Sequence, residues 1–256
     1  MFKCNLKDLE LLLISFNVPK HSTIIIHSSL FRFGLINGGV NSIYKVLRNV
    51  FDETYTLLMP TFTFSYGESR EWSCLYSKSE TGALTEFMRE LNPKNRSINP
   101  FHSIVVDGPN KDYLLGQISE SSFGQDSIFE KLYSLGAYNL SLGIDFIGGA
   151  TFCHYTEEYL KVPYRFYKSF PGNVLDNRNE KIEVDFKMYV RIIEKEYYYK
   201  NNWNVFWKEA NRKGLVNYTK FNNRAPVFLM NIRDSNDFLA EKIFENPFYV
   251  AEKIQI

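Results

Sequence analysis

The segment Thr23-Ile24-Ile25-Ile26-His27-Ser28-Ser29-Leu30 decides the class of fold. Its β-branched apolar run is too short for a helix and is typical of a buried strand, and it ends in polar side chains. Before it, apolar residues recur at helical spacing over residues 6–16, with Asn5 in the N-cap position. A helix followed by a buried strand is therefore the first unit of the chain.

The same alternation continues beyond this strand. A helical stripe over residues 43–50 precedes a second buried strand at 55–59, which Pro60 is expected to stop. A helix at 83–91 and a strand at 103–107 follow. Strands that alternate with helices predict an α/β fold with the sheet in the middle.

The C-terminal part has a different pattern. Apolar and polar residues alternate over 181–190, which predicts a half-solvated antiparallel strand, and helices are expected at 203–213 and 236–244. Pro171-Gly172-Asn173 makes residues 170–180 the best candidate for a loop or linker. We expect one domain over residues 1–256, with a core at 1–165 and a C-terminal elaboration at 166–256.

Composition excludes several classes of protein. The 256 residues include 30 Lys plus Arg and 29 Asp plus Glu, a net charge of +1 that argues against a dedicated nucleic-acid binder. No apolar run reaches the roughly 18 residues that span a bilayer, and the start lacks a signal-peptide core. Three distant cysteines make a disulfide scaffold or structural zinc site improbable. We expect a cytoplasmic globular protein with no membrane partner.

Polar residues after the expected strands are the candidates for chemistry, because ligand sites of α/β sheets gather at the carboxyl ends of strands. Thr151 suits an N-cap, which would place His154 and Glu157 one turn apart on one helical face. A carboxylate beside an imidazole favours a general base. The alternative is a structural histidine with a solvated glutamate; a metal site lacks further ligands.

The other histidines leave alternatives open. His27 is either a buried structural histidine or part of a ligand site, in which Ser28 and Ser29 could meet a phosphate or a carbonyl oxygen. His102 faces a pocket or caps a turn, and His21 belongs to the surface. Cys153 reads as a small core residue. The sequence contains no Gly-x-Ser-x-Gly elbow, dinucleotide fingerprint or P-loop.

Taken in order, these segments resemble the aminoglycoside 3-N-acetyltransferase (antibiotic N-acetyltransferase) family. The resemblance implies an α/β sandwich with a central mixed sheet, distinct from the GNAT fold, and an acetyl-CoA-dependent N-acetyltransferase that acts on a sugar amine without a metal. The motifs that carry it are His27-Ser28-Ser29-Leu30, Gly38-Gly39, Met59-Pro60-Thr61-Phe62-Thr63, Thr81-Gly82-Ala83-Leu84-Thr85, Arg96-Ser97, Asn99-Pro100, His102-Ser103, Phe123-Gly124 and Thr151-x-x-His154-x-x-Glu157 followed by Val162-Pro163-Tyr164-Arg165.

The resemblance also implies roles for single residues. His154 corresponds to the family's catalytic histidine, with Glu157 as its carboxylate. In this chain Asn99 stands where many members have a histidine, and Ile128 where many have a proline; His102 remains as a candidate for the acceptor site. The residues that correspond to the acetyl-CoA motif are His27, Ser28, Ser29 and Leu30, with Thr61, Thr81, Gly82 and Ser103 as less certain lining positions.

The acceptor is the least determined point. Residues 151–256, the expected acceptor side, hold 17 Lys plus Arg and 14 Asp plus Glu. This excess favours an anionic acceptor, a nucleotide-linked amino sugar for surface polysaccharide, whose diphosphate Arg165, Arg191 or Arg224 would meet. The alternatives are an aminoglycoside antibiotic, a hydrolase that uses Ser28 or Ser29 with His154, and a non-catalytic CoA- or sugar-binding homologue. Either a monomer or a homodimer is compatible with the sequence.

Overall fold

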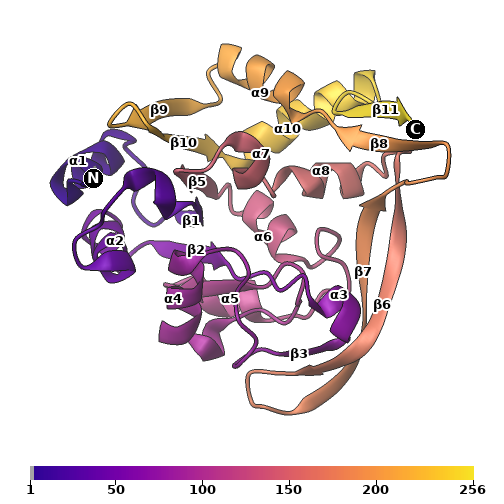
Figure 1. The fold of residues 1–256 in the computed structure, drawn as a ribbon, viewed down its shortest axis with the longest axis horizontal. Helices are drawn as coiled ribbons and strands as arrows, with labels where there is room; N and C mark the ends of the chain where they lie inside the picture. The colour runs from indigo at the N-terminus through magenta and orange to yellow at the C-terminus, as the bar shows by residue number, and fades with distance from the viewer. Residues whose placement is uncertain (1–2) are drawn as a thin grey trace.

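A six-stranded mixed sheet lies at the centre of the computed structural model, which describes residues 3–256 (Figure 1). The strand order is β4-β2-β1-β5-β10-β9, in which β1 runs parallel to β2 and β5 and the other pairs are antiparallel. The central mixed sheet of an α/β fold is thus confirmed. Its strands are β1 (Thr23–Ser28), β2 (Thr56–Pro60), β4 (Ile104–Asp107), β5 (Tyr138–Leu142), β9 (Asn217–Phe221) and β10 (Ala225–Asn231).

Helices cover both faces of this sheet. One apolar core holds Ile24 and Ile26 of β1 with the inner sides of α1, α2 and α4; the other holds Ile25 with α6, α8, α9 and α10. The alternation of side chains along β1 therefore feeds both cores. The helices are α1 (Leu6–Ser15), α2 (Gly39–Val50), α3 (Tyr66–Ser69), α4 (Ala83–Leu91), α5 (Lys111–Leu115), α6 (Ile128–Ser134), α7 (Phe146–Gly149), α8 (Cys153–Tyr159), α9 (Trp203–Arg212) and α10 (Ile232–Glu245), with 3₁₀ turns at Leu30–Phe33 and Pro93–Asn95.

Most expected elements are confirmed within a few residues. The Asn5 side chain accepts the Lys7 N–H and caps α1, as predicted. The second strand runs through Pro60 instead of stopping before it, because Pro60 occupies the last paired position and no further strand residue follows. The last helix starts four residues before the expected Asn236, where the Asn231 side chain accepts the Asp234 N–H.

A long hairpin corrects the prediction of a loop over residues 170–180. The strands β6 (Arg165–Leu175) and β7 (Lys181–Arg191) pair along their whole length, and only residues 176–180 form the turn. Gly172 lies inside β6 because a Cβ there would come within 2.5 Å of the Tyr66 hydroxyl and the Arg70 carbonyl. The glycine thus serves close packing, which the sequence presented as a turn signal.

Two small sheets complete the chain. The β6–β7 hairpin extends along one side of the molecule and pairs with β3 (Glu71–Ser73) (Figure 1). Near the C-terminus, β8 (Tyr197–Asn201) pairs with β11 (Ala251–Gln255), so the tyrosines of residues 197–199 lie in a strand. Within residues 3–256, no helix is long and apolar enough to cross a membrane.

Candidate active site

His154 and Glu157 form a hydrogen-bonded pair on α8, as the helical spacing predicts. Glu157 Oε2 contacts His154 Nδ1, and the carboxylate is fully buried while 26% of the histidine side chain is exposed. The helix begins at Cys153, after Phe152, and no side chain caps it. Thr151 is therefore not its N-cap, although the predicted geometry of the pair holds without the cap.

Two further side chains hold Glu157. Arg165 Nη2 lies 3.0 Å from Glu157 Oε2, and the Tyr164 hydroxyl donates to Glu157 Oε1 at 2.7 Å. The Arg165 guanidinium also donates to the Tyr189 carbonyl and to Asn201, and its side chain is only 8% exposed. The imidazole is thus oriented by a carboxylate whose own position is fixed from two sides.

The electrostatics suit a histidine that is neutral near pH 7. Burial, helped by Arg165 and Arg191, lowers the pKa of His154, and the neighbouring Glu157 offsets only part of that effect. Burial alone would raise the pKa of Glu157, but His154, Arg165 and Tyr164 hold it below its usual value. A neutral imidazole beside an ionised carboxylate can accept a proton at its remaining nitrogen.

Aromatic rings surround the imidazole. The ring of Phe123 lies 5.3 Å from that of His154, and the ring of Trp203 lies 5.5 Å from it on another element. Phe123 also packs against His102, 4.6 Å between ring centres, so one phenylalanine separates the two histidines. These contacts restrict the positions that the base can adopt.

A cavity of about 270 Å³ lies at the carboxyl ends of β1 and β2. His27, Ser28 and Thr81 line it together with Thr151, and a Cβ on Gly82 would touch the Ser28 carbonyl at 3.7 Å. Burial lowers the pKa of His27 to about 4, and its Nε2 is buried with no hydrogen-bond partner. Ser29 and Leu30 follow directly and are partly exposed. Phe62 also lines the cavity, so four segments that the sequence singled out meet there.

Thr61 and Ser103 do not line this cavity, contrary to expectation. Both are completely buried, and both hydroxyls accept hydrogen bonds from Arg96 Nε at 3.0 and 3.1 Å. The Thr61 N–H and hydroxyl both donate to the Ser103 carbonyl, and the Ser103 hydroxyl donates to the Thr61 carbonyl at 2.7 Å, so these three donors are already used within the protein. Arg96 is itself fully buried and lies over the Trp72 ring. Thr61 and Ser103 therefore belong to a buried hydrogen-bonded cluster around Arg96.

Asn99 and His102 lie together. The Asn99 side chain accepts the His102 N–H at 3.2 Å, and both line a small cavity of about 20 Å³. Burial, with a smaller effect of His154, lowers the pKa of His102 to about 3. His102 is therefore a neutral, mostly buried side chain behind Phe123.

Two of the three candidate arginines have partners within the protein. Arg165 forms the ion pair with Glu157 through its Nη2. Arg191 faces Arg165 across the hairpin and donates to the Tyr199 carbonyl at 3.4 Å. No hydrogen bond joins Ser28 or Ser29 to His154 in the described part of the chain, which gives the hydrolase alternative no support.

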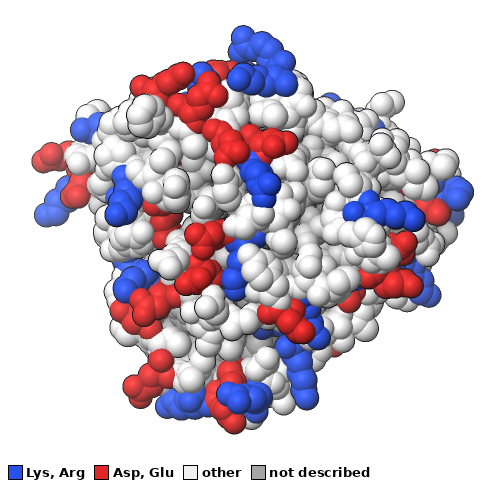
Figure 2. Space-filling model, turned by 180° about the vertical axis from the view of Figure 1, so that it is seen from behind, with Lys and Arg blue, Asp and Glu red and all other residues white. Residues whose placement is uncertain are grey.

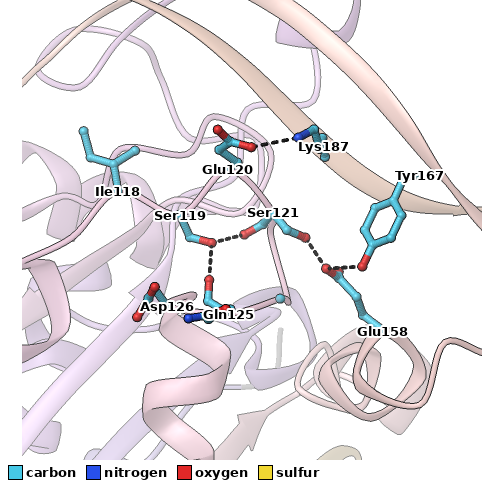
Figure 3. Close-up of a pocket in the computed structure, with 10 residues that line it drawn as sticks. Ile118, Ser119, Glu120, Ser121, Gln125, Asp126, Glu158, Tyr167 and Lys187 are labelled. Atoms are coloured by element: carbon cyan, nitrogen blue, oxygen red, sulfur yellow. Dashed lines mark hydrogen bonds and ion pairs between the residues drawn. The ribbon is translucent and has the colours of Figure 1, made fainter.

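A cavity of about 680 Å³ is lined by Glu158, the residue after Glu157 in α8, and is acidic (Figure 3). Glu120, Asp126 and Glu158 line it against a single base, Lys187. On the face opposite that of Figure 1, acidic and basic side chains are interspersed (Figure 2). The sequence did not predict this site, because no motif marks Glu158. The cavity also joins residues 118–126 to the β6–β7 hairpin, and these two segments are far apart in the chain.

Fold and site together define an α/β protein with a hydrogen-bonded His–Glu pair, a cavity at the strand ends and an acidic cavity lined by Glu158. The aminoglycoside 3-N-acetyltransferase family matches residues 25–244. The chain belongs to this family, as the sequence motifs indicated.

Known proteins agree with that assignment. The chain is 28% identical over 257 residues to the SPbeta prophage-derived aminoglycoside N(3')-acetyltransferase-like protein YokD of Bacillus subtilis, covering 90% of this chain and 88% of that protein. The structure of AAC-IIIb with CoASH has a TM-score of 0.80 at 17% identity, covering 96% and 97% of the two chains. The structure of AAC-VIa bound to sisomicin has a TM-score of 0.79 at 16% sequence identity, and the match covers 93% of this chain and 97% of that chain. These two structures have the same fold as this chain.

Proposed function

We propose that this protein is an acetyl-CoA-dependent N-acetyltransferase that acetylates an amine by direct transfer, with His154 as general base. The observation that carries this is the bond between Glu157 and His154 Nδ1, which leaves the second ring nitrogen to take a proton. Membership of an acetyltransferase family supports the same reaction.

The steps follow from the pair. His154 takes the proton that the amine loses as its nitrogen bonds to the thioester carbonyl carbon. The carbon–sulfur bond then breaks, and the thiolate that leaves receives a proton from the imidazolium or from water. Glu157 stabilises the imidazolium, and Arg165 and Tyr164 act as positioning residues because they touch Glu157.

The strand-end cavity is the proposed site of acetyl-CoA. His27, Ser28 and Thr81 line it, Ser29, Leu30 and Gly82 flank it, and the unpartnered Nε2 of His27 offers a hydrogen bond that the protein itself leaves unused. When bound, acetyl-CoA supplies the activated acetyl group. That a protein of the same fold has been crystallised with CoASH agrees with this placement.

For the acceptor, we propose an aminoglycoside-type polyamine in place of the nucleotide-linked amino sugar that the charge of the C-terminal part favoured. The family and the YokD relative support an aminoglycoside. The cavity lined by Glu158 holds three carboxylates and one ammonium group, which suits a polycation and repels a diphosphate. The net charge of half the chain supports the choice less than the charge of the cavity does, because it averages over the whole surface.

The organisation of the molecule remains part of the proposal. Residues 1–165 supply the pair and the strand-end cavity, while β6 and β7 add Tyr167 and Lys187 to the acceptor side. We propose that residues 1–256 act as one domain, as a monomer or homodimer in the cytoplasm.

Acetyl transfer tests the proposal directly. Release of the CoA thiol is followed with sisomicin, a kanamycin-type amine, or a UDP-linked amino sugar as the acceptor. Turnover with the polyamines only is expected; turnover with the UDP sugar only would restore the nucleotide-sugar alternative. His154→Ala should lose turnover by about 100- to 10,000-fold and retain CoA binding, whereas a non-catalytic binding protein would show no turnover to lose.

A further inference from the structure

The strand β8 and the start of α9 lie against the residues around the base. Tyr199 and Asn201 are two positions apart in β8, so their side chains point to the same side, and Trp203 follows at the first position of α9. The Tyr199 ring lies 5.9 Å from the Tyr164 ring, and the Trp203 ring lies 5.5 Å from the His154 ring. Asn201 stands between these two contacts in the chain.

The side chain of Asn201 contacts the arginine that holds Glu157. Its Oδ1 accepts a hydrogen bond from Arg165 Nη2 at 3.2 Å. The same Nη2 lies 3.0 Å from Glu157 Oε2 and 3.4 Å from His154 Nδ1. Three side chains therefore surround one nitrogen, and that nitrogen carries two protons.

The two protons of Arg165 Nη2 can satisfy only two of these three neighbours. When Glu157 and Asn201 take them, His154 Nδ1 keeps its own proton and donates it to Glu157. Without the amide, the second Nη2 proton would face Nδ1, which can accept it only in the tautomer that carries its proton on Nε2. In that tautomer the second ring nitrogen is already protonated and cannot act as a base.

We propose that Asn201 is a positioning residue for acetyl transfer. Its side-chain oxygen takes the second Nη2 proton of Arg165 and so keeps the His154 proton on Nδ1, with Nε2 free to accept a proton from the amine. The inference rests on the proposed function of His154 as general base. It gives β8, which contributes no residue to either cavity, a part in the reaction.

The C-terminal strand β11 fixes Asn201 in place (Figure 1). Asn201 pairs with Ala251 in the β8–β11 register, and the N–H of Asn202 donates to the Val250 carbonyl at 2.8 Å. Backbone hydrogen bonds therefore hold the position of residue 201 whatever its side chain. A substitution at this position should change the contact with Arg165 without removing the strand.

Asn201 adds no charge around the base. The charged or titratable groups near His154 are Glu157 on its own helix, Arg165 on β6, Arg191 on β7, and His102 at residues 99–103. From β8 and α9 come the amide of Asn201 and the indole of Trp203. A change of tautomer in Asn201→Ala would therefore come from the lost hydrogen bond, since no charge is altered.

Nitrogen-15 NMR of histidine-labelled protein tests the proposal without turnover. The shifts of the two ring nitrogens distinguish the tautomers, and His154→Ala identifies the His154 signals among those of the four histidines. At pH about 8, above the ordinary pKa of histidine, wild type should carry this proton on Nδ1. In Asn201→Ala the ratio of Nε2–H to Nδ1–H should rise by about 10-fold, whereas Asn217→Ala, an exposed position on β9, should match wild type. Equal ratios in Asn201→Ala and wild type, or a wild-type proton on Nε2, would overturn the proposal.

Kinetics distinguish positioning from a merely structural role. Asn201→Ala should lower kcat by about 10-fold and leave the KM for acetyl-CoA unchanged. Asn201→Asp keeps an oxygen for Arg165, so its kcat at high pH should stay within about threefold of wild type. The added carboxylate favours the imidazolium, so the acidic limb of the kcat/KM profile should move to higher pH, which Asn217→Asp should not cause. Equal losses of kcat in Asn201→Ala and Asn201→Asp, with an unmoved limb, would refute the role of Asn201.

A double variant shows whether Asn201 acts through the arginine. Arg165→Met removes the guanidinium, so adding Asn201→Ala to it should lower kcat no further. A further 10-fold loss in the double variant would mean that Asn201 acts by another route and would overturn the proposal.

The NMR measurement separates this inference from the proposed function. If wild type acetylates no amine, the proposed function fails, and the tautomer ratio of His154 still decides what Asn201 does. If wild type is active and the ratio does not respond to Asn201→Ala, only the role of Asn201 is refuted.

Discussion

Replacing Glu157 by Gln leaves the Arg165 guanidinium, 3.0 Å away and 8% exposed, without the carboxylate that compensates its charge. Breaking a buried ion pair from one side costs about 3–5 kcal/mol. For a chain of this size each kcal/mol corresponds to roughly 2–4 °C in Tm, so Glu157→Gln should lower Tm by roughly 6–20 °C. Thermal unfolding followed by circular dichroism measures this shift.

The same variant should alter catalysis in a distinct way. Without the carboxylate the imidazolium loses its stabilising partner, and kcat should fall by about 100-fold. Glu157 raises the pKa of His154, so its removal should move the acidic limb of the kcat/KM profile to lower pH. A limb that stays in place or moves to higher pH would refute the assignment of His154 as the base.

A double-mutant cycle checks the energetic part of this reasoning. Arg165→Met alone should also destabilise the protein, whereas Glu157→Gln combined with Arg165→Met removes both charges together. The double variant should therefore lose clearly less stability than the sum of the single variants. Additive losses would show that the two side chains do not stabilise one another.

Three further predictions concern stability and binding. Burial lowers the pKa of His27 to about 4 and that of His102 to about 3, so the stability that their neutral forms contribute is present above pH about 6.5 and lost as pH falls. Between pH 7 and 5 the free energy of unfolding, measured with urea, should fall by about 2 kcal/mol for each histidine. His27→Gln or His102→Gln should make the free energy of unfolding depend less on pH. Gly172→Ala should lower the free energy of unfolding by about 1–3 kcal/mol, because its Cβ would lie 2.5 Å from the nearest atoms. The control Gly67→Ala, whose Cβ would lie 3.6 Å from the nearest atom, should not destabilise the protein. Equal Tm values for the two variants would contradict the packing argument. CoA at 100 times its Kd should raise Tm by about 5–11 °C, and the absence of any shift would exclude the proposed CoA site.

Local signals in the sequence account for much of the fold. The run Ile24-Ile25-Ile26 is typical of a buried strand and forms one, and residues 83–91 form the helix that their spacing predicts. The pair His154 and Glu157 was predictable because helical geometry alone brings residues three apart together. Each of these features depends on neighbours in the chain.

The features that the sequence did not predict depend on contacts between distant segments. Pro171-Gly172 reads as a turn, and only the packing of Tyr66 against Gly172 explains its place in a strand. The bond from Arg165 to Glu157 and the burial of Thr61 beside Arg96 follow from tertiary packing that no spacing encodes. The acidic cavity likewise joins a loop, a helix and a hairpin.

The β6–β7 hairpin has a consequence for how the site is kept in alignment. Arg165 and Arg191, Tyr167 and Tyr189, and Ser169 and Lys187 are opposite pairs in its register. A slip by one residue would turn every side chain of the shifted strand to the other face and remove both the support of Glu157 and the wall of the acceptor cavity. The turn at residues 176–180, where Asp176 accepts two backbone N–H groups at 2.8 Å, sets that register from the far end of the hairpin. Insertions or deletions in this distant turn should therefore be as damaging to activity as changes beside the base.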